Sequence, residues 1–107
     1  MRVIVVRGEL DLSTASDLEG PLEEAISSQD DSVLIDLTDC EFIDSTGIAM
    51  IVRAWQQLAN RDGDDSSRVV ICSANEQVRR VLEITGLEIS IPVLEDREAA
   101  LAALRGS

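Results

Sequence analysis

The residues best suited to chemistry lie in one short stretch, 42–50, whose sequence is FIDSTGIAM. It joins an apolar run to an apolar helical pattern, so the hydroxyl pair Ser45 and Thr46 is predicted between a strand and a helix. A hydroxyl there accepts hydrogen bonds from the first free helix amides, which also stabilise a phosphate together with the helix dipole. We therefore expect Ser45 to be an exposed phosphate acceptor. The same residues also suit an ordinary helix start, because Asp and Ser are favoured caps and Gly47 permits close packing.

The composition argues against an enzyme. The chain contains no histidine and no lysine, and its nine basic residues are all arginines, which stay protonated and cannot act as a base. A carboxylate pair such as Asp11 with Asp44 could do acid/base work, but with 21 acidic residues such proximity is expected by chance. The scattered glycines form neither GxGxxG nor GxxxxGK[ST], so no ATP site of these kinds is expected. A kinase acting on Ser45 would have to be a partner.

The two cysteines do not indicate a metal site. Cys40 and Cys72 lack a CxxC spacing and there is no histidine to complete a Cys/His set, so we expect reduced packing residues and no metal or cofactor. The chain also shows no charged-then-apolar leader and no run of eighteen apolar residues, which predicts a cytoplasmic protein.

Length and charge narrow the class further. With 107 residues, of which 45% are hydrophobic and 2% aromatic, we expect a single domain over 1–107 and an aliphatic core, with Phe42 and Trp55 as isolated large fillers. The formal charge of −12 disfavours nucleic acid and anionic membranes as ligands. A protein partner should therefore present Arg or Lys, unless the acidity serves only solubility.

Strand and helix patterns alternate four times, which predicts an α/β domain with a mostly parallel sheet of four or more strands and helices packed on it. The first strand, 3–6, is β-branched, which predicts burial on both faces. Pro92 predicts that the last strand, 89–94, lies at an edge of the sheet or ends there. The expected strands are 3–6, 33–37, 69–72 and 89–94. The expected helices are about 14–28, 46–60, 76–85 and 96–104. Turns or loops are expected at 8–11, 29–32, 38–41 and 61–67.

Local signals refine two of these helices. Ser13 or Thr14 is the expected N-cap of the first helix, and Gly20-Pro21 predicts a kink or a division into two short helices. Asn75 is expected to cap the third helix, and Gly86 to end it in the left-handed conformation.

Three segments in this order resemble the STAS domain, most closely the bacterial anti-sigma factor antagonists. They are the GELD turn at 8–11, the FIDSTGI junction at 42–48 and the helix at 78–87, which together reach across 3–94. Family members usually have a further strand before 3–6, so the resemblance implies a missing N-terminal edge strand and a bare sheet edge. Pairing through that edge would give a weak dimer in place of a monomer.

The resemblance implies a regulatory cycle. In the family, the serine matching Ser45 is phosphorylated by an anti-sigma factor that is a Ser/Thr kinase, and the acidic residue matching Asp11 is important near it. The unphosphorylated antagonist binds the kinase and frees the sigma factor, the phosphorylated form releases it, and a phosphatase resets the switch. The alternative is a STAS scaffold that binds another regulatory protein or a small apolar ligand without phosphorylation. The expected partner-binding residues are Asp11, Asp44, Ser45, Thr46, Gly47, Met50 and Arg53.

Overall fold

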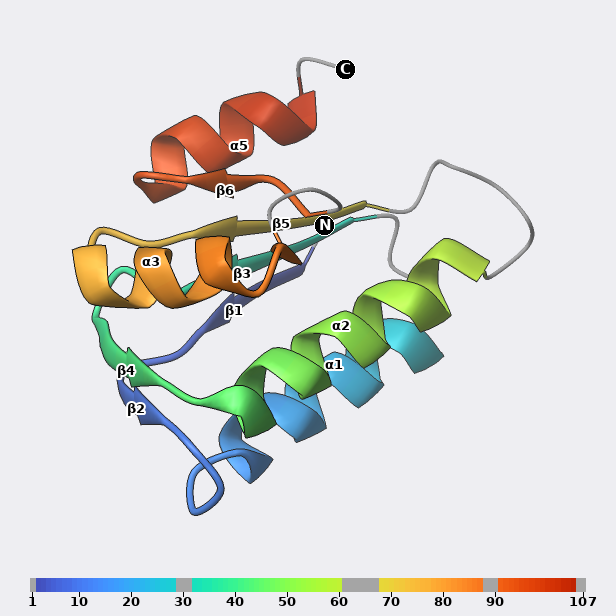
Figure 1. Ribbon diagram of the computed structural model, residues 1–107. Helices are drawn as coiled ribbons and strands as arrows, with labels where there is room; N and C mark the ends of the chain where they lie inside the picture. The colour runs from blue at the N-terminus through green and yellow to red at the C-terminus, as the bar shows by residue number, and fades with distance from the viewer. Residues whose placement is uncertain (1, 29–31, 61–67, 88–90, 106–107) are drawn as a thin grey trace.

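The computed structural model of the chain describes residues 2–28, 32–60, 68–87 and 91–105 (Figure 1). The loop predicted at 61–67 and the first part of the strand predicted at 89–94 lie outside these ranges. The elements in chain order are β1 Arg2–Val5, β2 Gly8–Leu10, α1 Ser16–Ser27, β3 Ser32–Asp36, β4 Cys40–Ile43, α2 Ser45–Asn60, β5 Arg68–Cys72, α3 Glu76–Ile84, β6 Val93–Leu94 and α5 Arg97–Arg105.

The main sheet has four strands in the order β1-β3-β5-β6, and every neighbouring pair is parallel. This confirms the predicted α/β class. The helices α1, α2 and α3 cover one face of the sheet and α5 covers the other (Figure 1). Because β3 and β5 are covered on both faces, their side chains form unbroken apolar runs in place of an alternating pattern.

Each face of the sheet has its own apolar core. Inward-facing residues of the strands meet the apolar stripes of α1, α2 and α3 in the larger core. The smaller one joins β3 and β5 to α5 and contains Leu34, Val70, Cys72 and Ala100.

The prediction that the first strand is buried on both faces is wrong for half of its residues. In β1, Ile4 is buried, whereas Val3 and Val5 keep 38% and 44% of their surface exposed. The reason is position, since β1 is an edge strand and α5 packs on β5 and β3.

The helix α1 also departs from its prediction. It runs unbroken through Pro21, so the predicted division into two short helices is wrong. Its N-cap position is Ala15, which makes no side-chain capping bond, in place of Ser13 or Thr14. Gly20 lowers the cost of this continuity, because a residue without Cβ avoids part of the clash that a proline ring makes with the preceding residue. The carbonyl that loses its N–H partner belongs to the exposed Asp17, where water can donate to it.

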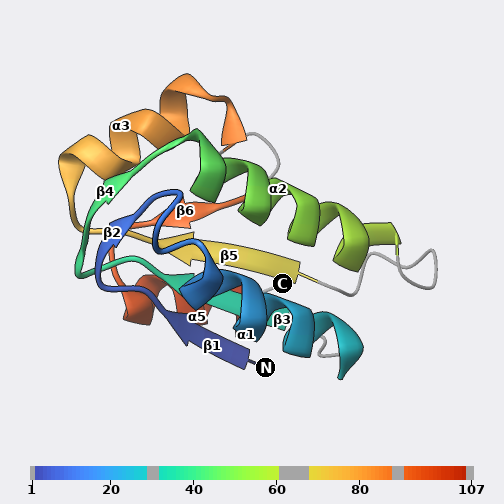
Figure 2. The same ribbon diagram turned by 90° about the horizontal axis from the view of Figure 1, so that it is seen from below.

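Two turns predicted at 8–11 and 38–41 contain strands. β2 and β4 pair in parallel as a separate two-stranded sheet, with Leu10 opposite Ile43 (Figure 2). At three and four residues, and with exposed glutamates in both, these strands are too short for a period-two pattern to be recognised. Their pairing brings the chain after β2 and the chain after β4 to the same end of the molecule.

The features predicted for α3 and for the position of β6 are confirmed. The Asn75 side chain accepts a hydrogen bond from the Val78 amide at 3.0 Å and caps α3, and Gly86 has a φ of 77° just after the end of that helix. β6 lies at the edge of the sheet, as the neighbouring Pro92 indicated.

Candidate functional site

The junction between β4 and α2 is capped by a carboxylate and not by a hydroxyl. Asp44 Oδ1 accepts hydrogen bonds from the amides of Thr46, at 2.9 Å, and Gly47, at 3.4 Å, so the expectation that a hydroxyl accepts these bonds is wrong. The helix begins at Ser45, whose side chain is therefore not needed for capping. Ser45 is exposed, as predicted, and Thr46 is half-buried.

Gly47 lets the first turn of α2 approach the paired strands β2 and β4. A Cβ atom at this position would lie 2.7 and 2.8 Å from Cγ and Cδ2 of Leu10 and 3.3 Å from Cγ1 of Ile43. In addition, the Asp44 amide donates to the Leu10 carbonyl at 3.1 Å. The start of α2 is thus held against the end of β2.

Asp11 follows β2 and organises the turn that leads into α1. Its Oδ1 accepts hydrogen bonds from the Ser13 hydroxyl at 2.7 Å, the Ser13 amide at 2.9 Å and the Thr14 amide at 3.2 Å. These hydrogen bonds lower the pKa of Asp11, and the bond from the Ser13 hydroxyl has the largest effect. The carboxylate therefore stays ionised and bonded to its own turn, and the turn presents Leu12, which is 79% exposed.

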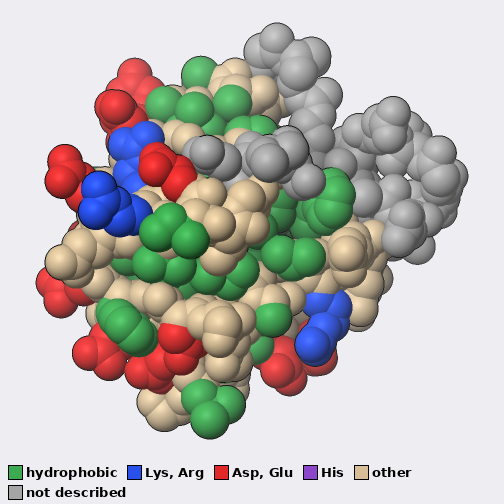
Figure 3. Space-filling model, viewed as in Figure 1, with side chains coloured by type: hydrophobic (Ala, Val, Ile, Leu, Met, Phe, Trp, Pro, Cys, Tyr) green, Lys and Arg blue, Asp and Glu red, His purple; other side chains and the backbone are tan. Residues whose placement is uncertain are grey.

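Large apolar side chains are exposed at this end of the molecule, beside β4 and in the turn after β2 (Figure 3). Phe42 in β4 is 49% exposed, so its prediction as a core filler is wrong. Trp55 in α2 is half-buried and packs against the larger core, in keeping with its place on the apolar stripe. Leu12 was not among the predicted site residues, although a lone leucine inside a polar turn indicates exposure.

A groove of about 390 Å³ runs between the start of α1 and the start of α2. It brings together three of the predicted site residues, Thr46, Met50 and Arg53. Met50 is half-buried against the larger core and Arg53 is exposed, while Gly47 is buried and Asp11 and Asp44 are half-buried. The full lining is Leu12, Ala15, Ser16, Glu19, Thr46, Ala49, Met50 and Arg53.

Comparison with known proteins places this geometry in a family. The sequence profile of the STAS domain matches residues 1–100. The chain belongs to the STAS domain family. The anti-sigma-B factor antagonist of Listeria monocytogenes is 33% identical over 90 residues, which cover 84% of this chain and 75% of that protein.

Solved structures support the same assignment of the STAS domain. A crystal structure of an anti-sigma factor antagonist from Mycobacterium paratuberculosis superposes with a TM-score of 0.86 at 26% identity, covering 96% of this chain and 84% of that one. The unphosphorylated form of the anti-sigma factor antagonist SpoIIAA has a TM-score of 0.72 at 19% identity, covering 98% and 89%, a likeness that shows the fold alone. The resemblance drawn from the three sequence motifs is confirmed.

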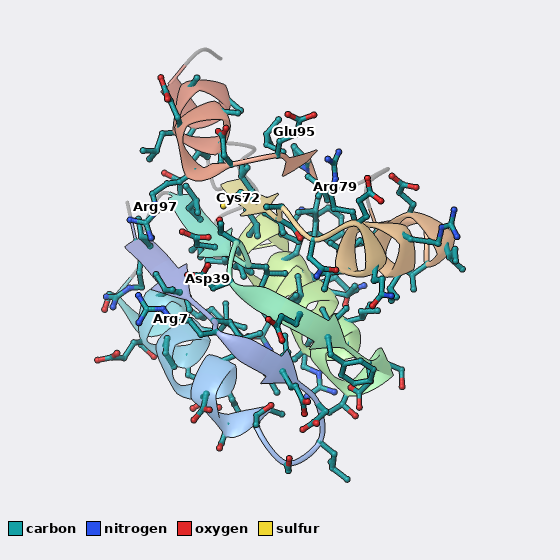
Figure 4. All side chains as sticks on the ribbon, turned by 90° about the vertical axis from the view of Figure 1, so that its left-hand side faces the viewer. Arg7, Asp39, Cys72, Arg79, Glu95 and Arg97 are labelled. Carbon is teal, nitrogen blue, oxygen red and sulfur yellow. The ribbon has the colours of Figure 1, made fainter. Side chains whose placement is uncertain are left out.

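The STAS domain carries a second polar cluster, on the α5 side of the sheet, which the sequence analysis did not identify. Arg97 contacts Oδ2 of the buried Asp36 through Nε at 2.8 Å and through a terminal nitrogen at 2.7 Å. The Thr38 amide and the Cys72 thiol donate to Oδ1 at 2.9 and 3.3 Å. Figure 4 shows Arg97 and Cys72 on the α5 side of β3 and β5.

These contacts set the charge states in the cluster. Burial alone would raise the pKa of Asp36, but the hydrogen bonds from Thr38, Arg97 and Cys72 outweigh it and lower the pKa to about 2. Burial, reinforced by the neighbouring carboxylate, raises the pKa of Cys72 to about 11. The cluster is therefore an ion pair with a neutral thiol beside it, and it fastens the start of α5 to β3.

Within residues 2–28, 32–60, 68–87 and 91–105, no three His, Cys, Asp or Glu side chains are grouped so that they could hold a metal ion. In the same ranges, no helix has the length and hydrophobicity needed to cross a membrane.

Proposed function

We propose that this STAS domain is an anti-sigma factor antagonist controlled by phosphorylation of Ser45. The unphosphorylated form binds an anti-sigma factor that is also a Ser/Thr kinase, and thereby releases the sigma factor. Phosphorylation of Ser45 by that kinase ends the binding, and a phosphatase restores it. The relatives named anti-sigma factor antagonists support the role.

The observation that carries the proposal is the exposure of Ser45 beside exposed apolar residues. A kinase can reach the hydroxyl without any unfolding, because Ser45 is the first residue of α2 and is on the surface. Leu12 and Phe42 expose apolar surface on the turn and strand next to the same junction. Apolar anchors of this kind contribute most of the binding energy in protein interfaces.

The charges around Ser45 explain how a phosphate would end binding. A phosphoserine adds about −1.5 to −2 charges at neutral pH. The amides of Thr46 and Gly47, which would otherwise stabilise it, are already bonded to the Asp44 carboxylate. The phosphate therefore remains solvated beside a like charge, and a partner would have to desolvate it to dock. A penalty of about 3 kcal/mol would weaken the complex roughly 100-fold.

The test is phosphorylation of the intact protein by its anti-sigma factor with ATP, followed by intact-mass measurement. We expect one added phosphate in the wild type and in Thr46→Ala, the matched control, and none in Ser45→Ala. Phosphate that persists in Ser45→Ala would overturn the assignment of the site.

Two further measurements separate charge from other effects. Ser45→Asp should lose more affinity for the anti-sigma factor than Ser45→Ala, and equal affinities would remove charge as the cause. Native mass spectrometry of protein from its host distinguishes the alternative, a STAS scaffold holding a small apolar ligand, because such a ligand adds a mass other than that of phosphate.

The same proposal leads to expectations for the location, ligands and oligomeric state of the protein. We expect it to act in the cytoplasm, where ATP is available to the kinase, and to act by binding, with no catalysis and no cofactor of its own. A charge of −12 disfavours direct contact with nucleic acid or membrane. We expect a monomer, or a weak dimer formed through the edge of β1.

A further inference from the structure

The groove between α1 and α2 continues beyond the junction at Ser45. A second hollow of about 150 Å³ adjoins it and is lined by residues further along both helices. The two hollows share Glu19, Met50 and Arg53, so they form one depression that runs along the α1–α2 interface. We call this depression, with the two linings together, the α1–α2 groove. The second lining is Glu19, Leu22, Glu23, Ile26, Met50, Arg53, Ala54 and Gln57.

The part of the α1–α2 groove next to the junction has a lining that suits an apolar side chain. Leu12 and Ala15 line it from the α1 side and Ala49 and Met50 from α2. The thioether of Met50, which is half-buried, can adapt its shape to an inserted group. Leu12, at 79% exposure, would gain apolar contact if a partner covered the groove.

Arg53 is the charge that distinguishes this groove. Among the arginines whose side chains the structure describes, four form ion pairs, namely Arg2, Arg7, Arg79 and Arg97. Figure 4 shows Arg7 directed toward Asp39 and Arg79 toward Glu95. Arg53 makes no ion pair within the described ranges although it lines the groove together with Glu19 and Glu23. It therefore offers a guanidinium with no ion-pair partner among the described side chains, in a protein of charge −12.

We infer that the α1–α2 groove receives an apolar side chain of the anti-sigma factor, and that Arg53 binds a carboxylate adjacent to that side chain. This inference rests on the proposed function and specifies its partner surface. Because the chain is strongly acidic, the docking face of the partner is expected to be basic overall. At Arg53 the preferred sign is reversed, so a partner with a carboxylate at that place fits best. A planar guanidinium can hold such a carboxylate through two hydrogen bonds.

A contact of this kind, with the charges reversed relative to the rest of the interface, affects the choice of partner more than it affects the overall attraction between the proteins. A partner with a uniformly basic face would place a positive group against Arg53, and like charges in contact disfavour wrong pairs. The groove would then distinguish the cognate anti-sigma factor from others that are attracted to the same acidic protein.

The test compares Arg53→Glu with Arg80→Glu. Arg80 is exposed on α3, forms no described ion pair and does not line the groove, so it is a matched control. Each substitution changes the formal charge from −12 to −14 and alters long-range attraction equally. We expect Arg53→Glu to weaken binding of the unphosphorylated protein to its anti-sigma factor by about 10-fold to 100-fold, and Arg80→Glu to leave it within about two-fold.

Two additional variants identify the partner group. Arg53→Lys should retain more affinity than Arg53→Ala, because lysine keeps the charge but loses the planar fork. Replacing carboxylates of the anti-sigma factor with arginine, one at a time, should restore binding to Arg53→Glu at a single position. We expect each variant to unfold at the wild-type temperature, because the substituted side chains are exposed, and this result would exclude a change of fold as the cause.

The outcomes separate this inference from the proposed function. If the wild type does not bind the anti-sigma factor, the proposed function is wrong and the inference falls with it. If the wild type binds and the variants at 53 and 80 behave alike, the inference alone is overturned.

Discussion

Replacing Gly47 with alanine tests whether the closeness of α2 to β2 is a requirement of the fold. The added Cβ would lie 2.7 and 2.8 Å from two carbons of Leu10, whereas carbon atoms in contact are normally about 3.5 to 4.0 Å apart. Leu10 is wholly buried, and one of these carbons is its branching Cγ, so a change of the outer methyl groups alone cannot relieve the contact. We expect α2 and β2 to separate by about 1 Å or the Leu10 side chain to leave its position.

The size of the effect follows from two opposing contributions. Overpacking of a well-filled core typically costs about 1–3 kcal/mol, and the double contact with Leu10 places this site toward the upper end. Alanine gains about 1 kcal/mol over glycine in a helix. The net expectation is a loss of about 1–2 kcal/mol in the free energy of unfolding, or roughly 4–8 °C in Tm for each kcal/mol.

Gly20→Ala is the matched control, because it makes the same chemical change inside another helix. Beyond its chain neighbours, a Cβ at Gly20 would meet no atom within 4 Å. The gain in helix propensity is opposed only by the ring of Pro21, so the stability should stay within about 1 kcal/mol of the wild type. Urea unfolding followed by far-UV circular dichroism and by Trp55 fluorescence measures both variants. If Gly47→Ala proves as stable as Gly20→Ala, the close approach of α2 to β2 is not a requirement of the fold.

Two further predictions concern the buried carboxylate of Asp36 and the two buried cysteines. The pKa of Asp36 is lowered to about 2, so the stabilisation from its ionised form is complete above about pH 4 and is lost as the pH falls toward 2. The pKa shift corresponds to about 2 kcal/mol. In acid unfolding over this pH interval, Asp36→Asn should therefore lose about 2 kcal/mol less stability than the wild type. Burial raises the pKa of both Cys40 and Cys72, the latter to about 11. Ellman's reagent should therefore find no reactive thiol in the native protein and two after denaturation. Fast reaction of the native protein would contradict the buried positions.

The parts of the fold that could be predicted from the sequence are those with long or local signals. The strands β3 and β5 are recognisable because complete burial makes them apolar throughout. The stripe of α2 and the Asn75 cap of α3 are recognisable because they depend on residues close together in the chain. The pairing of β2 with β4 depends on contacts between distant segments, and three residues are too few to show a period. The exposure of Val3 and Val5 likewise depends on where α5 lies, which no local pattern records.

The candidate site divides in the same way. Ser45 could be placed at a helix start because Asp44 and Gly47 flank it, and its exposure follows from that position. Which side chain takes the cap could not be predicted, because Asp44 and Ser45 are both good acceptors and only the backbone geometry selects between them. The pairing of Asp36 with Arg97, 61 residues apart in the chain, is a tertiary contact without a local signal.

The choice of Asp44 as the cap decides what the proposed phosphorylation could do to the fold. If Ser45 capped α2, adding a phosphate would replace the capping bond and reorganise the helix start. Since Asp44 holds the Thr46 and Gly47 amides, and Gly47 holds the same turn against Leu10, the proposed phosphate would find the helix already complete. The consequence of the proposed phosphorylation would then lie in the surface charge seen by a partner, and the fold beneath it would be the same in both states.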